Sequence, residues 1–181
     1  MAPIRTARLR LRSWRISDVY RYAEACNTSP VMRWLGGVQS EGAIAREVGY
    51  FINAEERDDM TFWALELARP KTFLGFCGLL VIRERDCPFR GQIEIGWRVR
   101  ESAWRRGFAF EAASAVLEHG FDQLKIPVIV SRAATKNIAS RKLMGKLGMQ
   151  RRRDMDYQSR GENGLLTAYS VTVDQWRNTR T

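Results

Sequence analysis

The sequence predicts one domain of mixed α/β class, with a mostly antiparallel central sheet of about seven strands and helices on both faces. Segments of two-residue hydrophobic alternation and segments of helical spacing follow one another in the order strand, two helices, three strands, helix, strand, helix and two strands. No repeat, low-complexity tract or linker separates them, so we expect residues 1–181 to form a single domain. Hydrophobic residues make up 45% of the chain, enough for a core without disulfides.

The first elements are a strand and two helices. Residues 8–12 alternate arginine with leucine, which predicts a strand with one buried face. Ser17 is expected to cap a helix that runs to about Cys26, with Asp18 in its first turn, where the helix dipole favours an acid. Ser40 precedes a second helix with an apolar face. That face carries Ile44, Val48, Phe51 and Ile52.

The loop between these helices, residues 28–37, carries Met32, Trp34 and Leu35, which we expect to be packed rather than exposed. From Thr61 the pattern changes to strands. We expect strands over residues 62–67, 73–82 and 92–99, joined by a turn at 69–71 and a charged loop at 83–90. The second of these strands is long and apolar, which is typical of a sheet centre.

Helical spacing predicts two further helices, over residues 107–124 and 137–147, the second ended by Gly148. The first has an apolar stripe of Ala113, Leu117, Phe121 and Leu124. Strands are expected over residues 126–131, 149–158 and 165–173, the last two joined by a turn at 161–164.

Composition excludes several classes of protein. No apolar run approaches the roughly 18–20 residues that span a bilayer, and the N-terminus has no apolar targeting core. The three cysteines form no Cys-x-x-Cys pair, so we expect a reduced, cytoplasmic protein. The single histidine, His119, argues against a metal site and against a Ser-His-Asp triad, and we interpret it as a packing residue.

The net charge is +10, with 25 arginines and 5 lysines. One interpretation is a solvated surface; the other is attraction to phosphates of a nucleic acid or a cofactor, or to acidic proteins near ribosomes. A non-enzymatic module that binds nucleic acid or the ribosome is therefore a competing hypothesis, although no RNA-binding signature is present.

The most informative segment is the strand over residues 92–99 with the basic turn and helix that follow it. A turn that leads into a helix N-terminus directs unpaired backbone N–H groups at one point, which suits a pyrophosphate. Gly107 allows close approach of an anion, Ala109 keeps the first helical turn slim, and Arg105 and Arg106 add charge. The dinucleotide and P-loop fingerprints are not matched.

A second motif begins about thirty residues later. Gly107 and Ala109 match the pattern Gln/Arg-x-x-Gly-x-Gly/Ala, and Asn137 and Ser140 match Asn-x-x-Ser in a helix that ends in Lys-x-Gly-Met. Together these motifs resemble the GNAT superfamily of acetyl-CoA-dependent N-acetyltransferases. The opening strand and the segments Gly-Phe-Cys-Gly and Glu-Ile-Gly-Trp are similar to its RimJ/RimL-like branch. The resemblance covers residues 5–176.

The resemblance implies a splayed sheet and specific contacts with acetyl-CoA. The pantetheine arm would pair with the backbone of Trp97, Arg98 and Val99 like an extra strand. The pyrophosphate would lie on Arg105, Arg106, Gly107, Phe108 and Ala109. Asn137 would bind the pantetheine region, and Ser140 would approach the sulfur.

Three positions depart from the family pattern. Trp104 stands where Gln or Arg is usual, and Arg105 where Gly is common. Met144 occupies the position of a tyrosine that protonates the leaving thiolate in many relatives, so that acid is absent.

The implied reaction is direct attack of an amine on the acetyl carbonyl in a ternary complex, with a backbone N–H near Trp97 to Val99 stabilising the oxyanion. Glu94 is the candidate base, with Gly96 beside it leaving room for a substrate; the alternative is that Glu94 pairs with Arg98 or Arg132. Ser140 is the candidate that assists the thiolate; the alternative is a bond back to a helix carbonyl. Tyr157 and Tyr169 are reserve candidates.

The acceptor expected from the family is a primary amine, either a protein N-terminal α-amine, with ribosomal proteins as one class, or a small molecule. Residues 32–37 would shape its pocket. The family also suggests a homodimer. Residues 151–153, three arginines, either contact an acidic substrate or form a solvated charged run. A GNAT fold that binds CoA without catalysis remains an open alternative.

Overall fold

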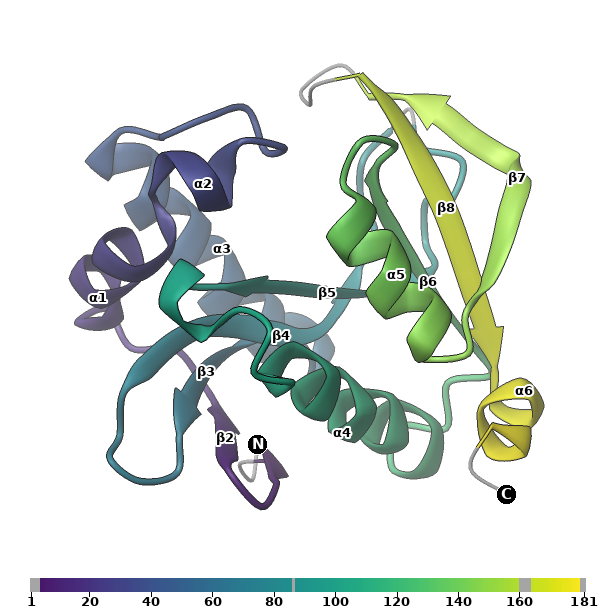
Figure 1. Ribbon diagram of the computed structural model, residues 1–181, viewed down its shortest axis with the longest axis horizontal. Coiled ribbons are helices and arrows are strands. Elements are labelled where there is room, and N and C mark those ends of the chain that lie inside the picture. The colour runs from purple at the N-terminus through teal and green to yellow at the C-terminus, as the bar shows by residue number, and fades with distance from the viewer. Residues whose placement is uncertain (1–3, 86, 160–163, 180–181) are drawn as a thin grey trace.

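The computed structural model describes residues 4–85, 87–159 and 164–179. Within them, eight strands form one open sheet in the order β1-β2-β3-β4-β5-β6-β8-β7 (Figure 1). The strands are β1 (Ile4–Arg5), β2 (Leu9–Arg12), β3 (Phe62–Leu67), β4 (Phe73–Val81), β5 (Ile93–Val99), β6 (Val128–Ala134), β7 (Gln150–Gln158) and β8 (Leu165–Thr172). The predicted sheet of about seven strands is confirmed, and the additional strand is the two-residue β1.

The helices are α1 (Asp18–Cys26), α2 (Ser29–Met32), α3 (Glu41–Asp58), α4 (Phe108–Asp122), α5 (Ile138–Lys146) and α6 (Val173–Asn178), with a 3₁₀ turn η1 (Glu101–Ala103). The short elements α2, η1 and α6 were not expected. The expected turn at 161–164 lies outside the described residues except for Gly164. None of the described helices combines the length and the apolar character that a membrane crossing requires.

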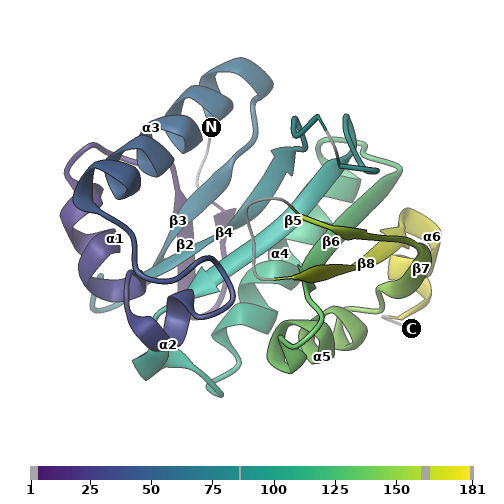
Figure 2. The same cartoon turned by 90° about the horizontal axis from the view of Figure 1, so that it is seen from above.

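Helices cover both faces of the sheet, as predicted (Figure 2). One core lies between the sheet and α4, α5 and α6, and includes Leu117, Met144 and Trp176. The other lies between the sheet and α1 and α3, and includes Tyr22 and Phe51. In the segment between α1 and α3, Met32 is buried and Trp34 and Leu35 are partly buried, so this segment is packed, as expected.

The two sequence-predicted helix caps differ. The Ser40 hydroxyl accepts a hydrogen bond from the Ala43 N–H at 3.3 Å and caps α3. The Ser17 side chain makes no capping bond to α1. The Asp18 carboxylate instead accepts from the Arg15 N–H at 2.9 Å, which ties the preceding turn to the start of the helix. The expectation that Ser17 caps this helix is therefore wrong.

The sheet is split between β5 and β6, the one parallel pair among the described strands. These strands pair only at Ile93 with Ile129 and at Glu94 with Val130. By contrast, β5 pairs with β4 as far as Val99, and β6 pairs with β8 as far as Ala134. Beyond Glu94 the two halves of the sheet therefore diverge and leave one edge of β5 without a neighbouring strand.

Candidate functional site

The split brings together two segments that lie about thirty residues apart in the sequence. Because β5 and β6 are parallel, their carboxyl ends lie at the same edge of the sheet. The basic turn and α4 follow β5, and α5 follows β6, so two helix N-termini flank the split (Figure 1). Both sequence-predicted motifs therefore meet at one place.

The backbone of β5 offers hydrogen-bonding groups to the split. The Arg100 N–H donates to the Leu74 carbonyl on the β4 side at 2.8 Å. On the opposite side, the Ile95 carbonyl accepts from Ser131 Oγ at 2.9 Å and the Val99 carbonyl from Trp104 Nε1 at 2.7 Å. Since backbone groups alternate in direction along a strand, those of Trp97 face the split.

Arg98 is directed elsewhere. Its backbone faces β4, opposite Phe76. Its guanidinium donates to Glu47 Oε2 at 3.0 Å and to the Tyr22 hydroxyl, and its Cζ lies 5.1 Å from the centre of the Phe76 ring. The structure therefore places Arg98 in the packing between the sheet and α1 and α3, and outside the set of residues expected to contact a cofactor.

The turn after β5 has a defined conformation despite its departures from the family pattern. Arg105 adopts a φ of 58° and Gly107 a φ of 80°, both in the left-handed region. That region costs a non-glycine residue about 1–2 kcal/mol, which accounts for the glycine common at position 105 in relatives. Trp104 fixes the turn to the end of β5 through its bond to Val99, so an indole replaces the usual Gln or Arg.

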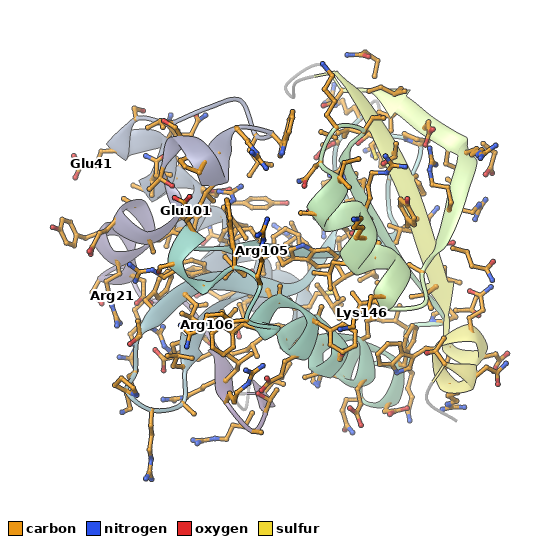
Figure 3. All side chains as sticks on the ribbon, in the orientation of Figure 1. Arg21, Glu41, Glu101, Arg105, Arg106 and Lys146 are labelled. Atoms are coloured by element: carbon orange, nitrogen blue, oxygen red, sulfur yellow. The ribbon has the colours of Figure 1, made fainter. Side chains whose placement is uncertain are left out.

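The turn presents backbone donors and positive charge at one point. The helix α4 begins at Phe108, and the N–H groups of its first turn have no partner within the helix. The Phe108 side chain is buried, whereas Arg105 and Arg106 are exposed. Figure 3 shows Arg105 beside η1 at the centre of the molecule and Arg106 on the side of the turn nearer β3. This arrangement suits a phosphate group.

At the other side of the split, Asn137 caps α5. Its Oδ1 accepts from the Ser140 N–H at 3.2 Å, which leaves its NH₂ group without a partner in the described residues. The Ser140 hydroxyl likewise makes no hydrogen bond within residues 4–85, 87–159 and 164–179, so the alternative of a bond back to a helix carbonyl is not found. Both groups are available to a ligand.

Met144 lies one helical turn after Ser140, and hence on the same face of α5. It is 1% exposed and belongs to the core beneath the helix. The position at which many relatives place an acidic hydroxyl is thus filled by a buried thioether. Ser140 contributes a hydroxyl group to this face of α5, one turn before Met144.

Glu94, at the apex of the split, is paired with Arg132. Arg132 Nε and Nη2 donate to the two carboxylate oxygens at 3.0 and 3.2 Å, which decides between the two arginines proposed as its partner. The Glu94 side chain is 11% exposed. Burial raises its pKa, and the charge and hydrogen bonds of Arg132 oppose that shift. Glu94 is therefore a buried carboxylate that remains close to a fixed positive charge.

Arg132 also contacts Glu84, Tyr157 and Cys87, and so links these three residues to Glu94. It makes two hydrogen bonds to Glu84, at 2.5 and 2.7 Å, and donates to the Tyr157 hydroxyl and to Cys87 Sγ. Tyr157 is thus brought next to the candidate base. Burial raises the pKa of Tyr157, so its hydroxyl is a neutral group at pH 7. The sequence offered Arg132 as one of two possible partners of Glu94. It did not predict the contact with Glu84, because the loop over residues 83–90 carries no pattern that places Glu84 beside Arg132.

Two expectations about the surroundings of Glu94 change. The space above Gly96 is not free, because a Cβ placed there would lie 2.6 Å from the ring of Phe62. That ring stacks on Phe76 with 5.2 Å between centroids. Tyr169 belongs to the core on the α4 side of the sheet, away from the Tyr157 cluster, and accepts a 3.4 Å bond from Arg141.

The remaining candidates have structural partners. His119 packs edge-on against Trp63, and burial lowers its pKa, consistent with a packing residue. In β7, Arg151 pairs with Asp156 and Arg152 with Asp154, so two of the three consecutive arginines are neutralised by acids of the same strand.

The comparisons with known proteins agree with this geometry. Residues 8–150 match the sequence profile described as acetyltransferase (GNAT) domain. The chain is 27% identical over 159 residues to the uncharacterized N-acetyltransferase YnaD of Bacillus subtilis (strain 168), covering 82% of each chain.

Two solved structures show the same fold. An acetyltransferase from Agrobacterium tumefaciens str. C58 aligns with a TM-score of 0.79 at 21% identity, covering 94% of each chain. RimL, a ribosomal L7/L12 α-N-protein acetyltransferase in complex with coenzyme A, aligns with a TM-score of 0.78 at 17% identity, covering 96% of this chain and 99% of that one.

Proposed function

This chain belongs to the GNAT acetyltransferase family, and from that premise we propose that it transfers the acetyl group of acetyl-CoA to a primary amine. The observation that carries the proposal is the split between β5 and β6, with a basic helix N-terminus on one side and the free Asn137 and Ser140 groups on the other. A thioester with a phosphorylated arm matches both the unpaired strand edge and the turn.

Acetyl-CoA supplies an activated acetyl group, so no covalent intermediate with the protein is needed. The Trp97 carbonyl and the Val99 N–H would hold the pantetheine arm along β5, because the Val99 carbonyl already accepts from Trp104 Nε1. The N–H groups from Arg105 to Ala109 hold the pyrophosphate. The Asn137 NH₂ group donates to the pantetheine amide region, and the Trp97 N–H, directed into the split, donates to the developing oxyanion.

Glu94 removes the proton of the acceptor ammonium, directly or through water. Its position at the apex of the split supports this role, and its pairing with Arg132 limits its strength as a base. A base of this kind suits an α-amine, with a pKa of about 7.7–8.0, better than a lysine side chain, with a pKa of about 10.4. Ser140 assists the departing thiolate from the face of α5 on which Met144 replaces the usual acid.

The acceptor we favour is therefore a protein N-terminal α-amine. The likeness to RimL in fold and the RimJ/RimL-like segments of the sequence support a ribosomal protein as one candidate. A screen that measures thiol release with N-terminal peptides, polyamines and amino-acid amides tests this choice. Turnover with small amines only would overturn it.

The cofactor site is tested by calorimetric titration with acetyl-CoA. Gly107→Glu introduces bulk and negative charge into the turn, and we expect it to abolish measurable binding. Gly91→Glu is the matched control, because Gly91 has a similar φ of 86° but lies in open space away from the turn.

Tight binding by the wild type and by Gly91→Glu, with none by Gly107→Glu, is the expected result. A folded wild type that does not bind acetyl-CoA would contradict the proposal and favour the basic nucleic-acid or ribosome-binding module. Binding without turnover in the acceptor screen would instead favour a CoA-binding fold that lacks catalysis.

A further inference from the structure

Arg8 lies against the turn, although it is about a hundred residues distant in sequence and precedes β2. Its Nε donates to Glu111 Oε2 at 2.6 Å, and its Nη1 donates to the Arg106 carbonyl at 3.1 Å. Its Cζ lies 4.5 Å from the centre of the Phe108 ring. All three contacts fall on the turn or on the first turn of α4, so the guanidinium is fixed there.

The carboxylate that holds Arg8 is itself held in place. Glu111 Oε1 accepts from the Thr6 hydroxyl and from the Arg8 backbone N–H, the latter at 3.0 Å. Burial opposes ionisation, but these hydrogen bonds and those of the Arg8 side chain keep the pKa of Glu111 below its usual range. Glu111 is therefore charged at neutral pH, and it orients the guanidinium instead of leaving it free to rotate.

The third nitrogen of the guanidinium has no partner among the described residues. Arg8 Nη2 makes no hydrogen bond within the described part of the chain, and a Cβ placed on Gly107 would lie 3.3 Å from it. Nη2 therefore lies at the glycine through which an anion approaches the turn. Arg105 and Arg106 are exposed, as Arg8 is, and Arg106 Cζ lies 5.0 Å from the centre of the Phe108 ring; unlike Arg8, neither guanidinium makes a hydrogen bond within the described residues.

We propose that Arg8 binds the pyrophosphate of acetyl-CoA through Nη2, with Glu111 as the residue that positions its guanidinium. This inference rests on the proposed function. A planar guanidinium can bind Glu111, the Arg106 carbonyl and a phosphate oxygen at the same time, whereas a lysine ammonium on a flexible stem cannot. Arg8 thus contributes to cofactor affinity and has no part in the acetyl transfer itself.

Arg8→Met tests the assignment, with Arg5→Met as the matched control. Arg5 is an exposed arginine of the same N-terminal segment whose side chain makes no hydrogen bond or ion pair within the described residues. For Arg8→Met we expect the Kd of acetyl-CoA to rise about 10- to 100-fold, the KM for acetyl-CoA to rise in parallel, and kcat at saturating acetyl-CoA to stay unchanged. Arg5→Met is expected to behave as the wild type.

Two further ligands test whether the loss of affinity in Arg8→Met comes from the pyrophosphate. Dephospho-CoA keeps the pyrophosphate but lacks the 3′-phosphate, so the loss in Arg8→Met should persist with it. Acetylpantetheine lacks all the phosphates, so wild type and variant should bind it equally. Arg8→Lys, which retains the charge and the aliphatic stem, should recover part of the affinity.

Each contrary outcome has a distinct meaning. Equal weakening with acetylpantetheine would show that Arg8 only supports the fold of the turn, and disappearance of the loss with dephospho-CoA would assign it to the 3′-phosphate; either overturns the inference. Wild-type affinity in Arg8→Met and Arg8→Lys also overturns it while leaving the proposed function intact. Failure of the wild type to bind acetyl-CoA would instead overturn the proposed function.

Discussion

At the scale of single residues, the site departs from the family pattern at Trp104 and Arg105, and at both positions the residue present still supports the turn. Arg105 adopts the left-handed conformation for which glycine is usual, and the Trp104 indole bonds to the end of β5. Asn137 uses its oxygen for the helix cap, and its NH₂ group makes no hydrogen bond to the described part of the chain. The turn therefore depends on the left-handed conformation at position 105 and on the indole bond of Trp104, and the N-terminus of α5 depends on the Asn137 cap.

The roles proposed for Glu94 and Ser140 predict different pH dependences. Glu94→Gln keeps hydrogen-bonding groups opposite Arg132 but removes the base, so we expect kcat/KM to fall about 100-fold or more and its acidic limb to disappear. Ser140→Ala is expected to lower kcat and to leave the acidic limb in place. The measurement is the pH dependence of kcat and of kcat/KM for the amine acceptor, obtained by varying the amine at saturating acetyl-CoA.

The control for the Glu94→Gln and Ser140→Ala variants is Ser102→Ala, because Ser102 is an exposed serine of η1. An unchanged acidic limb in Glu94→Gln, with full activity, would show that the Glu94–Arg132 pair is only structural. In that case the proton would pass to water or to another group of the cluster at Arg132.

At the scale of elements, a buried ion pair fixes α1 to the sheet. Arg12 of β2 donates to the Asp18 carboxylate at 2.7 and 2.9 Å, and both side chains are buried. Arg12 also donates to Glu66 of β3 at 3.1 Å. The helix that leads into the segment over residues 28–38 is therefore anchored by charge as well as by its apolar face.

Asp18→Asn is expected to lower the free energy of unfolding by about 3 kcal/mol at pH 7, because Arg12 loses one of its two charged partners in a buried site and keeps only Glu66. Burial alone would raise the pKa of Asp18, but hydrogen bonds from Arg12 and Arg15 hold it below its usual range. The stabilisation is therefore complete above the unfolded pKa of about 3.9 and is lost as pH falls through the folded value.

Urea unfolding of wild type and Asp18→Asn at several pH values measures this difference. It should stay constant from about pH 5 to 8 and shrink below about pH 4. Asp174→Asn, at an exposed acid in the first turn of α6, is the control. A difference that is absent at pH 7, or that grows as the pH falls, would contradict the account of the ion pair.

At the scale of the whole molecule, positive charge is distributed over the chain and is partly neutralised by neighbouring acids. Exposed Arg83 pairs with Asp58 at 2.7 Å, and Arg177 with Asp122 at 3.5 Å. At the split, by contrast, Arg105 and Arg106 have no acid within ion-pair distance in the described residues. A phosphorylated cofactor bound at this turn would therefore balance part of the net charge of +10. The homodimer and the cytoplasmic location expected earlier stay predictions.

Acetyl-CoA in the proposed site contacts both halves of the split sheet, so it should stabilise the entire fold. At a concentration 100 times its Kd, a ligand that binds only the folded state adds about 2.7 kcal/mol. For a chain of this length, that corresponds to a rise in melting temperature of roughly 5–10 °C. Differential scanning fluorimetry measures it, with Gly107→Glu as the variant that should show no rise. An equal rise in that variant would place the ligand elsewhere.

The sequence by itself determined the fold class, most of the elements and the two motifs. Alternation in β5, the apolar stripe of α4 and the glycines at helix ends are local signals, because each depends on residues within one element. The motif pair at Gly107 and at Asn137 to Ser140 predicted acetyl-CoA as the cofactor, through the resemblance to the family.

Only the tertiary structure decided which groups face the split. The alternation of β5 could not show which neighbour each side chain meets, and so Arg98 turned out to bind Glu47, and the ring of Phe62 to cover Gly96. The pairing of Arg132 with Glu94 and the position of Arg8 at the turn join residues 38 and about 100 positions apart. Such contacts leave no periodic trace in the sequence, because they depend on strand order and on where the sheet divides.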